Sequence, residues 1–281
     1  MRCAKRFAIA AACVAAFTVS AQNAAAQNVP TPFARSVCIK IQPGKNAEYM
    51  KLMTDVSMPV AQVHADAGEF SARFLMRTVY PAGMDAACDY EQVTLYPGFP
   101  PDPKTTMTAA TAYEKAHIAL KPSEFIAQRD SISRLRRSEL WRVRGSLGIP
   151  EKGNYARHNY VKVQPDDMAP WLKLEEETFK PVHQARIDFG AFKGWALVTL
   201  VMPSGSALPY NAMTVDIYKD WSSIGAPSKY QEAFQKAGKG EMSAAFTQSA
   251  KLRGAFVRTE LYEVVDVVTP RSGSRTSSGQ Q

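Results

Sequence analysis

The sequence is poor in the residues that most often build metal centres and nucleophilic sites. Among its 281 residues there are four cysteines and four histidines, and no two histidines have the spacing of metal ligands. Cys38 and Cys88, the cysteines outside the N-terminal segment, are not arranged as C-x-x-C. Phosphate-binding loops, dinucleotide fingerprints and nucleophile elbows are absent as well. We therefore expect no metal, and hydrolase and nucleotide-dependent functions have little support.

Long apolar runs are missing except near the start of the sequence. Residues 7–21 are uncharged and rich in Ala and Val, three basic residues precede them, and three alanines at 24–26 follow. That order is typical of a signal peptide cleaved at a small-residue site, whereas a membrane anchor needs about 20 apolar residues. We therefore expect removal of residues 1–26, with cleavage after Ala26. The remaining protein is expected to be periplasmic or secreted and to have no membrane segment.

The charge balance excludes one class of partner. The formal net charge is +8, but no run of Lys and Arg is interleaved with aromatic residues, as it often is in proteins that bind nucleic acids. Export would also separate the protein from nucleic acids. We therefore expect no nucleic-acid partner.

What the sequence does contain is an internal repeat. At a shift of 122 residues, IKIQP at 39–43 lies over VKVQP at 161–165, and many later positions also match. Near the end of each copy, RSELW at 137–141 lies over RTELY at 258–262, at a shift of 121 residues. Such self-similarity indicates a duplicated structural unit.

We place the two modules at residues 35–145 and 155–268. A linker with Gly and Pro separates them, and Ser, Gly and Gln dominate the tail at 270–281, which we expect to be disordered. The first module reads as strand, helix, two strands, a long helical stretch and a strand, with its clearest elements at residues 37–42, 49–63, 70–80, 90–96 and 138–143. Pro59 should interrupt the first helix. The order βαββαβ is that of the ferredoxin-like unit, an α+β fold.

Several of these segments resemble one family. The opening IKIQPGKNAEYMKLM, the proline in the first helix, Tyr96 and Tyr218 at the end of the third strands, and the closing RSELWRV and RTELYEV are similar to the dimeric α/β-barrel superfamily, nearest to NIPSNAP-like and antibiotic-monooxygenase-like modules. In that superfamily two sheets close into one barrel, usually from two chains. The resemblance implies that this chain forms an intramolecular, pseudo-dimeric barrel, as a monomer or weak homo-oligomer.

The resemblance also bears on cofactors. Some barrel relatives bind heme, but we find no histidine on the expected inward face of a strand, so no cofactor is expected. His64, His117 and His158 are expected to be surface or packing residues. His183 lies in the first helix of the second module, where some relatives line the mouth of the cavity. We therefore keep His183 as a candidate.

The alternation of side chains along the strands selects the other candidates. We expect the purely apolar face, with Val37, Ile39 and Ile41 on the first strand, to lie under the helices, and the opposite face to line the barrel. That inner wall mixes polar groups with aromatic ones, as small-molecule cavities do. The candidate ligand-binding residues are Lys40, Arg73, Tyr96, Glu139, Trp141, Lys162, His183, Trp195, Asp216, Tyr218, Glu260 and Tyr262.

Two features of this wall have alternative interpretations. Lys40 with Glu139, and Lys162 with Glu260, are expected to lie on neighbouring strands, where each pair either binds a ligand or only neutralises buried charge.

Positions that differ between the modules are better candidates for specificity. Asp216 stands where the first module has Thr94, and Trp195 stands where it has Arg73.

The two remaining cysteines are expected to stay unpaired. Antiparallel first and third strands would send Cys38 and Cys88, each taken to begin its strand, to opposite ends of the sheet, about 15–20 Å apart. A disulfide tolerates roughly 4.4–6.8 Å between Cα atoms.

Three functions remain open at this point. The protein binds a small anionic or aromatic molecule inside the barrel; or it is an enzyme of the cofactor-independent oxygenase or isomerase type, as the resemblance allows; or it is a non-catalytic interaction protein. No catalytic residue can be named.

Overall fold

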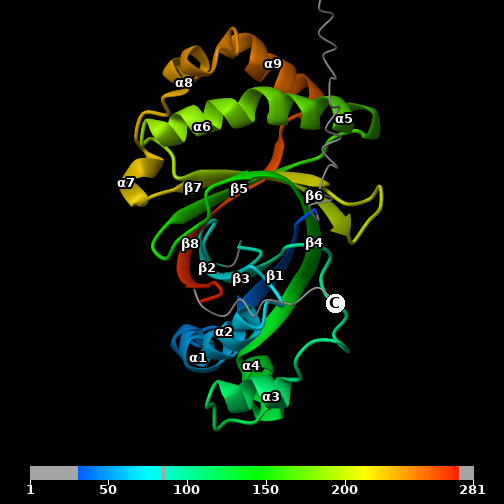
Figure 1. The fold of residues 1–281 in the computed structure, drawn as a ribbon, viewed down its shortest axis with the longest axis vertical. Coiled ribbons are helices and arrows are strands. Elements are labelled where there is room, and N and C mark those ends of the chain that lie inside the picture. The colour runs from blue at the N-terminus through cyan, green and yellow to red at the C-terminus, as the bar shows by residue number, and fades with distance from the viewer. Residues whose placement is uncertain (1–30, 84–85, 272–281) are drawn as a thin grey trace, which may run out of the picture.

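The chain forms a closed barrel between two layers of helices (Figure 1). The computed structural model describes residues 31–83 and 86–271. Eight strands in these residues pair in the order β1-β3-β2-β8-β5-β7-β6-β4. The predicted signal segment and nearly all of the predicted tail lie outside the described residues. No helix within the described part of the chain is long and apolar enough to cross a membrane.

Each half of the barrel has the predicted order of elements. The first half consists of β1 (Phe33–Ile41), α1 (Asn46–Leu52), η1 (Met53–Ser57), α2 (Met58–Asp66), β2 (Ala72–Tyr80), β3 (Tyr90–Tyr96), α3 (Ala109–Lys115), α4 (Pro122–Ile132) and β4 (Ser133–Leu147). The second consists of β5 (Tyr155–Val161), α5 (Pro165–Leu174), η3 (Glu175–Phe179), α6 (Lys180–Asp188), β6 (Gly194–Met202), β7 (Ala212–Tyr218), α7 (Trp221–Ile224), α8 (Tyr230–Ala237), α9 (Met242–Arg253) and β8 (Phe256–Val268). The fold is two ferredoxin-like units fused in one chain.

The two long strands close the barrel. β4 has 15 residues and β8 has 13, against about 5 or 6 in a typical strand. This length lets β4 pair antiparallel with β1 of its own half and with β6 of the other half. β8 pairs in the same way with β5 and β2. The pseudo-dimeric barrel implied by the resemblance is therefore confirmed.

The first helix of each half changes its winding before a proline. A π-helical segment, η1 or η3, separates two α-helices, and Pro59 or Pro181 then occupies the first turn of the next helix. The backbone stays helical across the junction, because Ser57 and Met58 have α-helical dihedral angles and the N–H of Met58 bonds to the carbonyl of Met53. The π-helical turn next to the proline is one of the usual sites where a helix adapts to a missing hydrogen bond. The expected interruption at Pro59 is thus a change of winding at Met53–Ser57, just before the proline, and the chain stays helical from Asn46 to Asp66.

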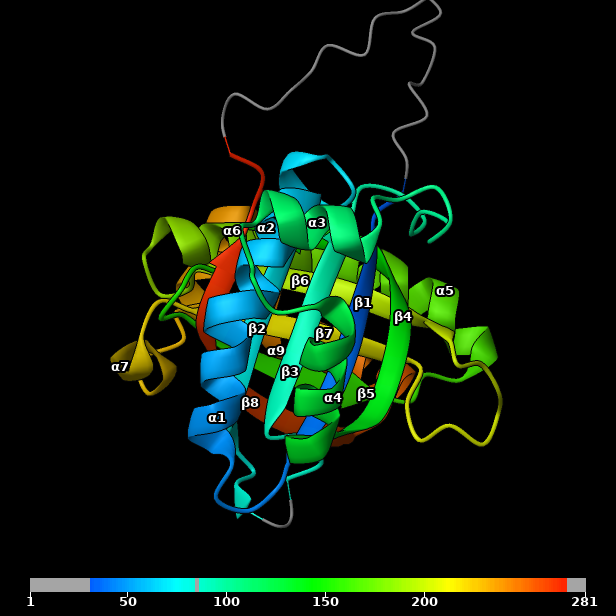
Figure 2. The ribbon, with the colours of Figure 1, turned by 90° about the horizontal axis from the view of Figure 1, so that it is seen from below.

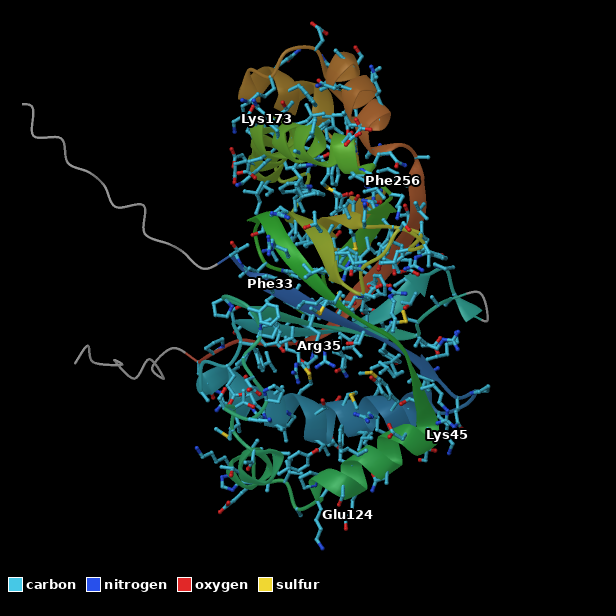
Figure 3. All side chains as sticks on the ribbon, turned by 90° about the vertical axis from the view of Figure 1, so that its right-hand side faces the viewer. Phe33, Arg35, Lys45, Glu124, Lys173 and Phe256 are labelled. Carbon is cyan, nitrogen blue, oxygen red and sulfur yellow. A yellow bond between two sulfur atoms is a disulfide. The ribbon has the colours of Figure 1, made fainter. Side chains whose placement is uncertain are left out.

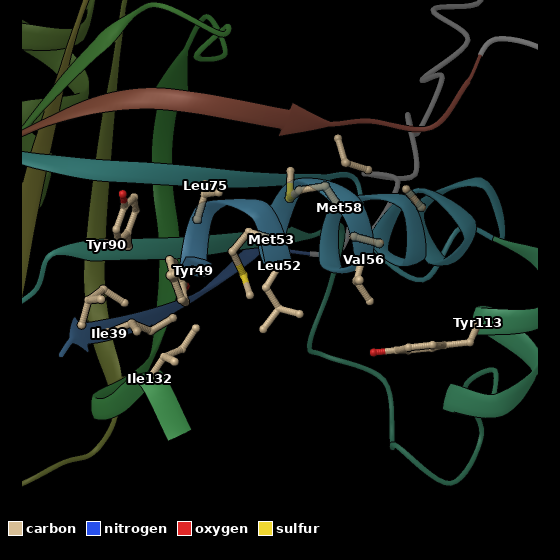
Figure 4. Close-up of a cluster of buried hydrophobic side chains, with 14 of the residues drawn as sticks. Ile39, Tyr49, Leu52, Met53, Val56, Met58, Leu75, Tyr90, Tyr113 and Ile132 are labelled. Atoms are coloured by element: carbon tan, nitrogen blue, oxygen red, sulfur yellow. The ribbon is translucent and has the colours of Figure 1, made fainter. Parts of the chain in front are cut away.

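Both faces of the barrel wall carry apolar side chains. Outside the first half, α1 and α2 pack on the strands around Tyr49, Leu52 and Leu75 (Figures 2 and 4). Inside the barrel, side chains from both halves meet, as Phe74 and Tyr262 do. The wall therefore separates an inner core, shared by the two halves, from an outer core under each helical layer.

Cys38 and Cys88 form a disulfide, with 5.3 Å between their Cα atoms. The expectation of two free thiols is wrong because β1 begins at Phe33, earlier than expected, so Cys38 lies in its second half. The antiparallel register then places Ile39 opposite Tyr90, the first residue of β3. Cys88 precedes that residue closely and reaches the end of β1 where Cys38 lies.

Candidate functional site

A cavity of about 1150 Å³ lies between the first half of the barrel and the helices that cover it. Arg35, Val37 and Ile39 of β1 and Arg73 of β2 line the barrel side, and Ser57 is one of the residues that line the helical side. Figure 3 shows Arg35 on the side of the barrel that faces α1 and α2. The volume is large enough for a small organic molecule, and the wall combines apolar surface with a few charged groups.

Residues from several elements form the helical side of this cavity. Met53 of η1 and Tyr113 of α3 both line it. Figure 4 shows Tyr113 standing apart from the grouped side chains around Met53 and Leu52. The remaining cover is the loop after β3, which adds Phe99 and Asp102 to the lining.

This cavity lies outside the barrel, whereas the candidate residues were selected to point into it. The prediction of which side chains face the helices and which face the barrel interior is wrong for the second and third strands of each half. Val93 and Val215 pack inside the barrel with Phe74, so Thr94 and Asp216 face the helices. The barrel interior is itself an apolar core, so apolar residues line both faces of these strands and do not mark the helix side.

The structure divides the sequence candidates into three groups. Those on the helix side are Arg73, Tyr96, Trp195, Asp216 and Tyr218. Those inside the barrel are Glu139, Trp141, Glu260 and Tyr262. Lys40 and Lys162 lie at strand ends, and His183 lies on α6. Of these candidates, Arg73, Tyr96 and Glu139 line the large cavity. Glu139 does so although its carboxylate is bonded inside the barrel.

Charged groups inside the barrel bind one another. Arg137 donates to Glu139 Oε2 at 3.3 Å and to the Tyr160 hydroxyl at 3.1 Å, and its Nη2 lies 3.8 Å from Glu260 Oε2. The Tyr210 hydroxyl donates to Glu139 Oε1 at 2.5 Å. Burial raises the pKa of Glu139, against the effect of these partners. Such a mutually bonded network stabilises the junction of the two halves.

Lys40 and Lys162 hold the loops that connect the second and third strands. Lys40 Nζ lies 2.9 Å from Asp89 Oδ1, and Lys162 Nζ donates to backbone carbonyls before β7. The pairs expected with Glu139 and Glu260 do not form. The antiparallel register places each glutamate several residues along the sheet from the lysine.

Aromatic side chains fill the corresponding space of the second half. Trp195 packs against Trp171 of α5. His183 stacks on Phe192 and Trp195, with ring centroids 5.4 and 5.2 Å apart. Burial lowers the pKa of His183 to about 3, and Arg186 Nη1 lies 3.1 Å from its Nδ1. His183 is thus a neutral residue of a packed core.

The repeat alignment explains why the two halves differ in packing. Ser57 and Ala61 stand where the second half has Phe179 and His183. Phe179 and His183 are both buried, whereas Ser57 lines the cavity. In the first half, the small residues on the helix therefore leave a volume open. In the second half, two aromatic rings occupy the equivalent volume.

The halves also differ in the charge next to the third strand. In the second half Arg157 and Trp195 flank Asp216 across neighbouring strands. Arg157 donates to Asp216 Oδ2 from Nε at 3.1 Å and from Nη2 at 2.5 Å, and the carboxylate is 5% exposed. This arginine is therefore neutralised within the protein.

In the first half the equivalent row is Arg35, Thr94 and Arg73. Arg73 Nε donates to Thr94 Oγ1 at 3.0 Å, and Arg35 Nε donates to Ser138 Oγ at 3.2 Å. Within the described residues neither guanidinium has a carboxylate at ion-pairing distance. Burial lowers the pKa of Arg73, and the nearby Arg35 acts in the same direction. Two cations therefore border the cavity without an internal counterion.

A histidine and a carboxylate also line the cavity. His64 Nδ1 of α2 lies 2.7 Å from Glu69 Oε2, and both side chains are about one-fifth exposed. Glu69 Oε1 accepts the backbone N–H of Met107 at 2.7 Å. The glutamate is thus fixed through both oxygens, and it fixes one ring nitrogen of the histidine.

Sequence reasoning missed Arg35, His64 and Glu69. The expected first strand begins at Val37 and so excludes Arg35, although the repeat alignment places Arg35 over Arg157. The sequence predicts a surface or packing role for His64, whereas the structure places it on the cavity wall. Nothing in the sequence signals the contact between His64 and Glu69, because it depends on the turn between α2 and β2.

Groups of three or more His, Cys, Asp or Glu residues that could hold a metal ion are absent from residues 31–83 and 86–271.

No protein-family model matches the chain, and no curated protein sequence matches it. Among solved structures it is similar to a candidate monooxygenase from Fusobacterium nucleatum subsp. nucleatum, with 12% identity and a TM-score of 0.53 over 85% of this chain and 95% of that chain. It is also similar to a candidate monooxygenase from Lactobacillus acidophilus, with 9% identity and a TM-score of 0.54 over 85% and 96% of the two chains. These likenesses show that the chain has the dimeric α/β-barrel fold.

Proposed function

We propose that the cavity in the first half of the protein binds a small organic anion with an aromatic or other apolar body. The observation that carries this proposal is the row Arg35, Thr94 and Arg73, in which two arginines flank a neutral residue. Arg73 is partly buried and Arg35 is exposed, so the burial argument applies to Arg73. A half-buried guanidinium without a carboxylate is costly unless an anion accompanies it. A bound carboxylate, sulfonate or phenolate supplies the missing charge.

The rest of the cavity suits the apolar body of such a ligand. Val37, Ile39 and Met53 offer aliphatic and thioether surface, and Phe125 and Tyr113 offer aromatic rings. A guanidinium that binds the carboxylate of the ligand orients the ligand, while the apolar wall buries most of the ligand's surface. The proposed ligand site is therefore on the helix side of the first half, whereas the sequence predicted a site inside the barrel.

The location of the protein belongs to the same proposal. A signal peptide over residues 1–26 would direct it to the periplasm or outside the cell. The Cys38–Cys88 disulfide supports that location, because disulfides persist in oxidising compartments. The ligand is then an organic anion encountered outside the cytoplasm.

Binding of 2-naphthoate and of the neutral 2-naphthamide, followed by isothermal titration calorimetry, tests the proposal. We expect the protein to prefer the carboxylate at least tenfold. Thr94→Asp should reduce 2-naphthoate binding at least tenfold, because it places beside Arg73 the carboxylate that Asp216 provides in the second half. Thr94→Asn has nearly the same size and no charge, so it should bind 2-naphthoate within about threefold of the wild type. Equal binding of the acid and the amide, or equal effects of Asp and Asn, would contradict the proposal.

A further inference from the structure

We propose that His64 and Glu69 act as a general-base pair in this cavity and take a proton from a carbon next to a carbonyl group of the bound anion. The proposal rests on the proposed binding function and adds a reaction class to it. The substrate class is an aromatic 2-oxo acid or a similar carbonyl-containing organic anion.

The contacts of Glu69 fix the protonation of the ring. An ionised carboxylate only accepts hydrogen bonds, so the ring nitrogen 2.7 Å from Glu69 Oε2 must carry a proton. In the neutral imidazole the lone pair is then on Nε2. No hydrogen bond from a described residue reaches this Nε2. The nitrogen that can accept a proton is therefore free, on a side chain that lines the cavity.

The pair occurs in the half that has the cavity. The repeat alignment places Arg186 and Ala191 at the positions of His64 and Glu69. Arg186 is buried between the rings of Phe192 and Tyr230, at 4.0 and 3.9 Å from their centroids, and has a packing role. The turn between the first helix and the second strand therefore folds without a histidine–carboxylate pair.

The cavity also supplies the charge that the reaction needs. When Nε2 takes a proton from the carbon, the C–H electron pair forms the new C=C bond, and the π pair of the carbonyl group moves to its oxygen to give an enolate. Glu69 stabilises the imidazolium, and Arg73 stabilises the enolate oxygen or the carboxylate beside it. The imidazolium then returns a proton to carbon, or to oxygen to give the enol. No oxidant or cofactor takes part in this step.

The same pair would suit an axial heme ligand, because ligating histidines commonly donate their other N–H to a carboxylate. The base role is favoured by Arg73, since proton abstraction needs a positive charge beside the developing anion and iron ligation does not. Titration with hemin separates the two roles. A Soret band that forms with the wild type and is lost in His64→Ala would overturn the base proposal.

Phenylpyruvate is a suitable probe, because it carries a carboxylate, an aromatic ring and acidic protons on C3. We expect the full-length protein in D2O to accelerate exchange of these protons, followed by ¹H NMR, beyond an equal concentration of free imidazole. His64→Ala should lose at least 100-fold of this acceleration, in line with about 10²–10⁴-fold for general-base catalysis. Added imidazole should restore part of it. His117→Ala, at an exposed histidine outside the cavity, should exchange at the wild-type rate.

Binding measured in parallel keeps the two proposals apart. If phenylpyruvate binds and its protons do not exchange faster, the base proposal is overturned and the binding proposal stands. If 2-naphthoate binds and phenylpyruvate does not, the base proposal with its 2-oxo acid substrate class is overturned and the binding proposal stands. If neither binds, both are overturned. Exchange that persists in His64→Ala would also overturn the base role.

Glu69 is a positioning residue in this scheme, and Glu69→Gln tests it. The amide oxygen can still accept the N–H of His64, although its NH2 group then faces the backbone N–H of Met107. The amide cannot stabilise an imidazolium by charge. We expect kcat for exchange to fall at least tenfold with KM within about threefold. A rise in KM with kcat unchanged would show that Glu69 only shapes the cavity.

Discussion

Cys38 in β1 and Tyr160 in β5 occupy equivalent positions in the two halves of the barrel, and each ties its strand to the loop before the third strand. Cys38 does so through the disulfide to Cys88. Tyr160 does so through ring contact with Tyr210, at 4.7 Å between centroids, and Tyr210 is the equivalent of Cys88. The same strand and loop are thus joined by a covalent bond in the first half and by an aromatic pair in the second.

Removing the disulfide should destabilise the protein. The bond closes a loop with a sequence separation of 50 residues. In the chain-entropy model a loop of this length contributes about 4 kcal/mol, so we expect the double variant Cys38→Ala with Cys88→Ala to unfold with a free energy lower by about 3–5 kcal/mol. Urea denaturation of both proteins measures the difference. Thiol titration of denatured wild type should find no free thiol from these residues, and two would contradict the structure.

The repeat could be predicted by comparing the sequence with itself, and the element order could be predicted because it depends on local patterns. Segments such as residues 90–96 alternate clearly, and the structure has β3 at these residues. The closed barrel was predicted from the family resemblance joined to the repeat. These features depend on patterns within about ten residues or on direct self-comparison.

The faces of the strands and the site could not be predicted so well. The rule that apolar residues face the helices succeeds for β1, where Val37 and Ile39 lie under them, and fails for β3, where Val93 points inward. Strand register decides both this and the disulfide, and it is a tertiary property. The cavity depends on Ser57 being small beneath a helix, which matters only once the helix is placed on the sheet.

Ser57→Phe should fill the cavity of the first half. Phe179 occupies the equivalent place in the second half and is 4% exposed. We expect at least a tenfold loss of 2-naphthoate binding, with no loss in the free energy of unfolding, because the new ring enters space that is already open. Ser57→Ala is the control and should bind as the wild type does. Unchanged binding by Ser57→Phe would place the ligand elsewhere.

Asp216→Ala should affect stability and leave binding unchanged. Its carboxylate accepts from Arg157 and, at 3.2 Å, from Asn159. Removing the carboxylate leaves these donors unsatisfied, which typically costs about 1–3 kcal/mol of unfolding free energy. We expect a value in the lower part of this range, because the Arg157 side chain is 39% exposed and water can solvate it. Thermal or urea unfolding measures the loss. A clear change in 2-naphthoate affinity would instead indicate that the second half takes part in binding.

Glu175→Gln should remove a dependence of stability on pH. Glu175 of η3 is buried, and burial raises its pKa from 4.5 to about 7, against the opposing effect of Arg253. The folded protein therefore binds more protons than the unfolded chain between these values, and this residue's contribution is most favourable at low pH and is lost as pH rises from about 4.5 to about 7. Above that range the cost is on the order of 3–4 kcal/mol, from a pKa raised from 4.5 to about 7 and about 1.4 kcal/mol for each pKa unit.

The neutral Gln pays no such cost, so we expect Glu175→Gln to be more stable than the wild type at pH 8 and similar to it at pH 5. The difference between the two proteins in free energy of unfolding, measured by urea at both pH values, isolates this residue from all other titrating groups. Glu177→Gln is the matched control, because Glu177 lies on the same segment with its side chain 63% exposed. It should follow the wild type at both pH values. If Glu175→Gln is no more stable than the wild type at pH 8, the carboxylate is already well accommodated in its charged form and its pKa is close to the ordinary value.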